Sequence, residues 1–179
     1  MTASTAPKTL HIASKLMSLL GKIQITDDAG TVLYESRARW GWLSKPWSIT
    51  QDGLEVATVT RKLYSFAPVW NVRTRDGDFI LRDKLWNWRR HITVVGGRFD
   101  GAVLRGSLLD MDFELALRGQ VIARAQAKVL TLRTRHSIEL LDTTPQAELL
   151  TAILMTNLLA QKREDNNMAA AEPTPPHLQ

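Results

Sequence analysis

Short segments in which apolar and polar residues alternate fill most of this chain, and this alternation is typical of β-strands that bury one face. The run from Glu55 to Leu63 shows the pattern, and Arg75-Asp76-Gly77 is a turn of the kind that joins two such segments. Applied to the whole chain, the pattern predicts twelve strands, at residues 9–16, 21–27, 31–39, 46–51, 54–63, 69–75, 78–85, 90–95, 100–107, 111–117, 120–129 and 134–141.

A triplet of apolar, small and apolar residues recurs at intervals of about 22 residues. Six copies of one two-stranded unit indicate an antiparallel meander, and a long meander usually closes because closure removes its exposed edges. The copies are Met17-Ser18-Leu19, Trp40-Gly41-Trp42, Tyr64-Ser65-Phe66, Trp86-Asn87-Trp88, Leu130-Thr131-Leu132 and the degenerate Leu108-Leu109-Asp110.

A helix is predicted after the last strand. Thr144 and Pro145 form a typical helix start, with Glu148 in the first turn. The apolar residues from Leu149 to Ala160 surround this helix, so it should be buried on every side. It is shorter than the roughly 20 apolar residues of a bilayer span. A barrel of twelve strands has a lumen that one helix would fit. We therefore predict a mainly β fold, a closed antiparallel 12-stranded barrel enclosing a buried C-terminal α-helix.

The 179 residues suffice for one domain, which we place at residues 9–163. Residues 1–8 and the proline-containing tail 164–179 are expected to be disordered. The chain has no cysteine, which excludes disulfides, thiol nucleophiles and cysteine-ligated metals. The start of the chain lacks the features of a secretory signal, so we expect a cytoplasmic protein, with peripheral attachment to the membrane under the lipid hypothesis below.

Three stretches resemble the LURP-one-related family of the tubby C-terminal-like and phospholipid scramblase superfamily. They are Leu16-Met17-Ser18-Leu19 continuing to Gly30, Val56 to Pro68, and the helix Ala147–Ala160, and the resemblance extends over about residues 9–163. It implies a twelve-stranded barrel around a C-terminal helix. It also implies a non-enzymatic role in which lipid binding, including that of phosphoinositides, or membrane-linked signalling recurs.

The net charge of +5 is concentrated between Thr31 and Gly106, and lysines and arginines recur near the ends of alternate predicted strands. Alternate strands of a meander end at the same rim, so these cations could form a surface that binds anionic lipid. Alternatively, they are solvated strand ends whose charge opposes aggregation. The candidates are Arg37, Arg39, Lys45, Arg61, Lys62, Arg82, Lys84, Arg89 and Arg90.

Four tryptophans lie beside these cations, Trp40 and Trp42 in one cluster and Trp86 and Trp88 in another. Aromatic rings next to lysine or arginine suit the interface of a membrane. Alternatively, the repeat requires a large apolar residue at these positions, and the tryptophans cap the core of the barrel.

Asp110, Asp112 and Glu114 share one face of a strand and could bind Ca²⁺ through their oxygens. Leu115 stands where a calcium loop starting at Asp110 would need glycine, so an acidic outer face without metal is favoured. No cofactor is expected.

Nothing in the sequence favours catalysis. The four histidines are scattered, and no nucleophile elbow or glycine-rich phosphate loop is present. The sequence also lacks the standard nucleic-acid-binding modules, which argues against nucleic acid as a partner.

The leading hypothesis is a non-enzymatic module that docks on anionic phospholipid surfaces, with Trp42 or Trp88 inserted at the interface. One alternative is a soluble scaffold that binds a protein partner or a small ligand. The other is scramblase-like lipid transfer, which would require the helix to leave the barrel.

Overall fold

The structure is a computed structural model that describes residues 7–15, 22–39, 46–65, 67–85, 90–107, 112–125 and 136–171. Within these residues it contains twelve strands and one long helix, as the alternation predicts. The strands are β1 (Lys8–Lys15), β2 (Lys22–Thr26), β3 (Val32–Ala38), β4 (Trp47–Gln51), β5 (Leu54–Arg61), β6 (Val69–Thr74), β7 (Phe79–Leu85), β8 (Arg90–Val95), β9 (Val103–Ser107), β10 (Asp112–Leu117), β11 (Gln120–Ala125) and β12 (His136–Leu140).

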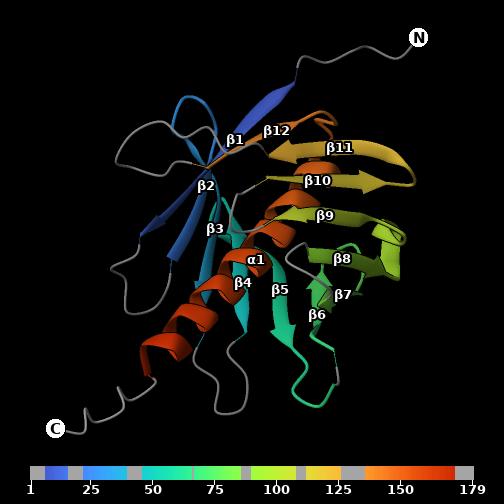
Figure 1. Ribbon diagram of the computed structural model, residues 1–179. Coiled ribbons are helices and arrows are strands. Elements are labelled where there is room, and N and C mark those ends of the chain that lie inside the picture. The colour runs from blue at the N-terminus through green and yellow to red at the C-terminus, as the bar shows by residue number, and fades with distance from the viewer. Residues whose placement is uncertain are drawn as a thin grey trace, which may run out of the picture.

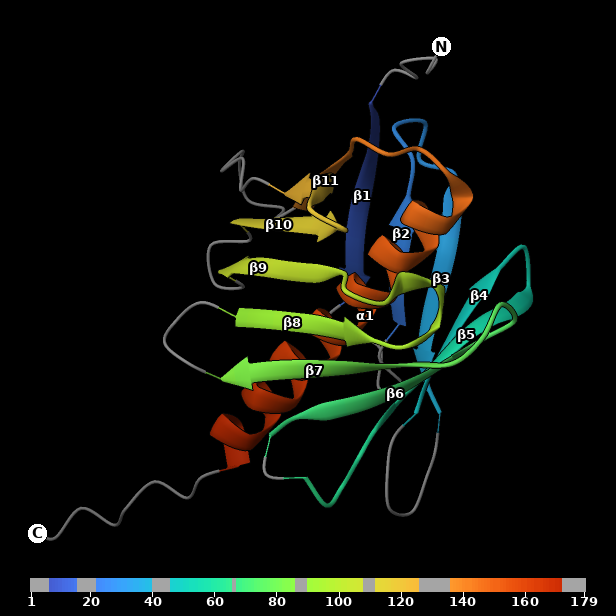
Figure 2. The same ribbon diagram turned by 90° about the vertical axis from the view of Figure 1, so that its right-hand side faces the viewer.

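The twelve strands form one closed antiparallel barrel, which confirms the predicted fold class. Each strand pairs with the next one along the chain, and β1 closes the barrel by pairing with β12, Lys8 lying opposite Leu140. The strands surround the helix α1 (Pro145–Ala171) in Figure 1, and Figure 2 shows β7 to β11 stacked in sequence order along one side of it.

Alternate side chains of the strands point inward and form the core together with α1. Ile49, Val72, Leu81 and Ile92 are completely buried on four strands. Trp47 is buried as well, so this aromatic ring belongs to the core. The period of two that predicted the strands is therefore the division between the lumen and the outer surface.

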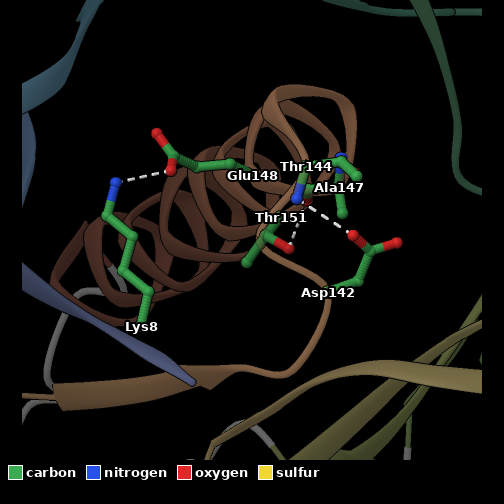
Figure 3. Close-up of polar contacts among 6 residues, drawn as sticks. All are labelled: Lys8, Asp142, Thr144, Ala147, Glu148 and Thr151. Carbon is green, nitrogen blue, oxygen red and sulfur yellow. Dashed lines mark hydrogen bonds and ion pairs between the residues drawn. The ribbon is translucent and has the colours of Figure 1, made fainter. Parts of the chain in front are cut away.

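The start of α1 follows the predicted chemistry. The backbone N–H of Ala147 donates to the Thr144 hydroxyl at 3.3 Å, and Thr144 itself is held by Asp142 at 2.9 Å. One turn further, Thr151 donates to the carbonyl of Ala147, and Glu148 contacts Lys8 of β1 at 2.7 Å (Figure 3). The helix start is thus capped by its own loop and tied to the first strand.

The helix is enclosed by the barrel, as its all-round apolar pattern predicts. From Ala147 to Gln161, only Leu149 and Leu159 are not fully buried. The helix is longer than expected, however, because it continues to Ala171. The helix thus extends past residue 163, where the sequence placed the end of the domain. Alanines 169 to 171 are strong helix formers and extend the helix.

Several strands are shorter than predicted by a residue or two, and β9 differs most clearly, at its start. β9 begins at Val103, whereas the pattern placed its start at residue 100. A 3₁₀ turn, Gly97–Phe99, occupies the connection, and the ring of Phe99 packs edge-on against Phe79 with centroids 5.6 Å apart. Because Phe99 is buried in this turn, residues 100–102 are not part of strand β9.

Candidate functional site

The two ends of the barrel are distinguished by which connections they carry. Because neighbouring strands are antiparallel, all odd-numbered strands finish at one end, which we name the loop end, and all even-numbered strands finish at the turn end. α1 enters at the turn end, where Glu148 meets Lys8. Further along, Thr156 lies 2.7 Å from the hydroxyl of Ser36 in β3.

The connections at the two ends have opposite net charge. At the loop end, the connection residues that the structure describes carry two cations, Arg39 and Lys62, and no acid, which gives +2. At the turn end, three cations against seven acids give −4: Arg75, Arg98 and Arg118 against Asp27, Asp28, Asp52, Asp76, Asp78, Asp100 and Asp142. The barrel is therefore polarised along its axis.

Arg37 and Arg39, near the loop end, are engaged by acids on the outer face. The carboxylate of Glu35 lies 2.6 Å from both Lys22 and Arg37. Burial by itself would raise the pKa of Glu35, but the contacts from Lys22, Arg37 and Gln24 outweigh it and hold the pKa below its usual value. These cations are thus partly neutralised.

Arg39 contacts Glu55 of β5 at 3.3 Å. The hydroxyls of Ser48 and Thr58 also donate to this carboxylate. The bond from Ser48 is the main reason that the pKa of Glu55 is lowered, with smaller contributions from Thr58 and Arg39. Glu55 is therefore charged at neutral pH and offsets the charge of Arg39.

Arg90 points toward the lumen. Its guanidinium lies 3.0 Å from the carboxylate of Asp83, which is completely buried. Burial raises the pKa of Asp83, while Arg90 and then His91 act in the opposite direction. Arg90 compensates a buried charge, so its role in the fold is to hold β7 against β8.

Lys62, Arg82 and Lys84 differ from these three. Each is exposed, and none forms an ion pair with another described residue. The N–H of Lys62 donates to the carbonyl of Val69, which lies opposite Arg82, so Lys62 and Arg82 share one row across β5, β6 and β7. Arg61, also exposed, ends β5 next to Lys62.

Strand register extends this surface with two residues that sequence reasoning missed. His91 lies directly opposite Lys84 on one side and Arg105 on the other. Lys84 and Arg105 thus carry like charges in one row, and an anion placed over that row would be favoured. Only the pairing of β7, β8 and β9 brings these residues together, and the sequence alone holds no signal for that register.

Several candidates lie outside the described residues. They are Lys45 and Arg89 among the cations, the tryptophans Trp40, Trp42, Trp86 and Trp88, and the carboxylate Asp110. Asp112 and Glu114 are exposed on β10, and Glu114 contacts Arg124 of β11 at 3.3 Å. No group of three metal-ligating side chains comes together within the described ranges.

Comparison with protein families finds that the LURP-one-related family matches residues 8–153. The chain belongs to the LURP-one-related family. This family is part of the tubby-like and scramblase superfamily, and the twelve-stranded barrel fits that assignment. Neither the curated proteins nor the solved structures gave a match to the chain.

The LURP-one-related barrel is not a known enzyme fold, but one contact in it resembles a catalytic arrangement. His11 lies 2.8 Å from Asp28 and 3.4 Å from the hydroxyl of Ser137. The serine contact is long, and the Asp28 side chain is 70% exposed. Acyl transfer requires a water-excluded site with oriented charges. This contact therefore serves to join β1, β12 and the turn after β2.

Among the residues that the structure describes, no helix combines the length and the apolar character that crossing a bilayer requires.

Proposed function

We propose that this LURP-one-related barrel docks end-on upon anionic phospholipid surfaces, with its loop end toward the bilayer. The observation that carries the proposal is the axial charge polarity of the described connections, +2 at the loop end against −4 at the turn end. The exposed Lys62, Arg82 and Lys84, with Arg105 beside them, continue the basic surface onto the outer wall. Membrane-linked signalling would be the setting of such a module.

The magnitudes support a defined orientation. Each cation near an anionic surface contributes about 1 kcal/mol, and this falls off within a Debye length of about 8 Å at physiological salt. β5 alone has eight residues, each rising about 3.3 Å. The acidic turn end of a barrel standing on its loop end therefore lies beyond the reach of the surface potential.

Docking fits the geometry better than lipid transfer does. Scrambling through an inserted helix would require α1 to leave the barrel. That would strand the buried lining of the lumen in water, including Ile49, Leu81 and Ile92, and break the contacts of Glu148 and Thr156. Exposure of this much apolar surface is costly at about 25 cal/mol per Å².

The test is co-sedimentation with vesicles of phosphatidylcholine, alone and mixed with phosphatidylserine or a phosphoinositide, at low and physiological salt. The loop-end variant is Lys62→Gln/Arg82→Gln/Lys84→Gln. Its control, Arg73→Gln/Arg75→Gln/Arg118→Gln, removes the same charge from exposed residues at the turn end. The loop-end variant should bind on the order of 100-fold more weakly, because three cations are lost from the surface.

The turn-end control should bind like the parent protein. Equal losses in both variants would mean that only net charge matters, and end-on docking would be rejected. Failure of the parent protein to bind any anionic vesicle would favour a soluble scaffold for a protein partner or small ligand.

A further inference from the structure

The connection between β5 and β6 presents two neighbouring apolar side chains to solvent. Tyr64 is 91% exposed and Leu63 is 48% exposed. Large apolar residues at the surface are individually common, but two adjacent ones on a projecting connection are a candidate contact site. Lys62 precedes them and is exposed as well.

Their position on the barrel sets them apart from the other large exposed apolar residues of the described chain. Val32, Leu54 and Leu141 lie at the turn end, each beside an aspartate-containing turn. Leu63 and Tyr64 lie at the loop end. The basic residues Lys62 and Arg82 share a row beneath them.

The backbone below this pair is fixed. Lys62 donates to the carbonyl of Val69 at 2.8 Å, and the N–H of Asp83 donates to the carbonyl of Pro68 at 3.1 Å. These bonds join both sides of the connection to the ladder of β5, β6 and β7. The exposed position of Tyr64 therefore rests on a hydrogen-bonded base, and the ring is already presented before any partner arrives.

We propose that Leu63 and Tyr64 are the anchor that inserts at head-group level when the barrel docks on an anionic bilayer. Tyrosine suits this depth because its ring is apolar and its hydroxyl reaches water or head groups. Lys62 can lay its methylene stem along the same surface and keep its ammonium at the phosphates. The anchor rests on the proposed docking function and adds which residues enter the lipid.

The absence of cysteine in the chain permits a direct test. Tyr64→Cys and, as a control, Leu54→Cys are each labelled with a fluorophore whose emission depends on polarity. Leu54 is 58% exposed at the opposite end. On phosphatidylserine-containing vesicles the label at 64 should shift to the blue and be quenched by spin-labelled lipid, while the label at 54 should not change.

A second variant separates insertion from charge. Leu63→Ser/Tyr64→Ser should bind such vesicles about tenfold more weakly, because the buried apolar area is lost. Its salt dependence should match that of the parent, whereas Lys62→Gln/Arg82→Gln/Lys84→Gln should have a shallower one. Thermal unfolding of the serine variant should be unchanged, since both side chains are exposed.

The outcomes distinguish the anchor from the docking function. The parent protein could bind vesicles while the emission of the label at 64 does not change and the serine variant keeps its affinity. That result would overturn the anchor and leave docking intact. Tyr64 would then be available to a protein partner. A parent protein that binds no anionic vesicle would overturn both proposals together.

Discussion

The turn end and the loop end of the barrel both return the chain from one strand to the next, but they use different residues for different reasons. At the turn end, Asp27 accepts a hydrogen bond from the N–H of Thr31, and Asp52 and Gly53 both take positive φ values, 51° and 76°. Aspartate and glycine are what tight hairpins require. The acidic charge of this end is thus largely a by-product of making turns.

Three exposed cations at or near the loop end have no such explanation. Lys62, Arg82 and Lys84 make no ion pair with a described residue, and no turn geometry calls for them. A charged residue that makes no contact needed for folding is a good candidate for a binding function. The comparison teaches that charge at the turn end reflects folding, whereas the charge of Lys62, Arg82 and Lys84 is free for a partner.

The largest effect should come from a glycine close to the loop end. A Cβ at Gly106 would overlap the carbonyl oxygen of Asp112, so Gly106→Ala should destabilise the fold by on the order of 4 kcal/mol. At Gly53 nothing lies within 4 Å, and Gly53→Ala should cost only about 1 kcal/mol, the strain of a positive φ. Urea unfolding of both variants measures the difference, and equal costs would contradict it.

The next largest effect is expected for Arg90→Ala, which should lower the free energy of unfolding by about 3 kcal/mol near neutral pH. The substitution leaves the buried Asp83 carboxylate without its partner. The pKa of Asp83 is raised, so the folded protein disfavours its ionised form above that pKa, and the penalty is relieved as the pH falls through it. The deficit of the variant should therefore shrink in urea unfolding at acid pH. A deficit independent of pH would assign it to packing alone.

A smaller effect is expected for Glu35→Gln, about 1 kcal/mol at neutral pH, since the carboxylate is only partly buried. Because the pKa of Glu35 is lowered on folding, its stabilisation is present above the unfolded value of about 4.3 and disappears as the pH falls through the folded value. Parent and variant should thus converge in acid. Parallel curves of stability against pH would rule out this account.

The smallest effect is expected for a change of charge at the turn end, and it tests the difference between the two ends most directly. Asp52→Asn/Asp78→Asn raises the net charge by two at the turn end, and end-on docking predicts that vesicle affinity at physiological salt stays within about twofold. Non-oriented adsorption predicts a clear gain from the same change. Co-sedimentation of the variant beside its parent decides between them.

The barrel and its helix follow from periodicity, because burial of one strand face and of all helix faces imposes those patterns. Antiparallel strands also fix which strand ends coincide, so the sequence could predict that Arg39 and Lys62 lie in connections at the same end. Which cations are neutralised does not follow. Arg37, Arg39 and Arg90 look equivalent to Arg82 in the sequence, yet three meet a carboxylate and one does not.

That difference depends on register, which short-range pattern does not contain. Asp83 occupies an inward position in β7, and only its pairing with β8 places Arg90 beside it. The same pairing sets His91 between Lys84 and Arg105. Sequence reasoning could therefore name candidate cations, but it could not separate those that meet a carboxylate from those that do not.

The closure of β1 upon β12 around α1 also determines when the chain can complete its fold during synthesis. During synthesis β1 leaves the ribosome long before its partner β12, and the helix that fills the lumen is made after all twelve strands. Until then, the strands already made can form only an open sheet, which has an unpaired edge at each side and no helix against its apolar face. Pairing between strands so far apart in the sequence is slow, and the incompletely folded chain is prone to aggregation until it is complete. The synthesis of β12 and α1 is thus the step that allows an open sheet to close into a barrel.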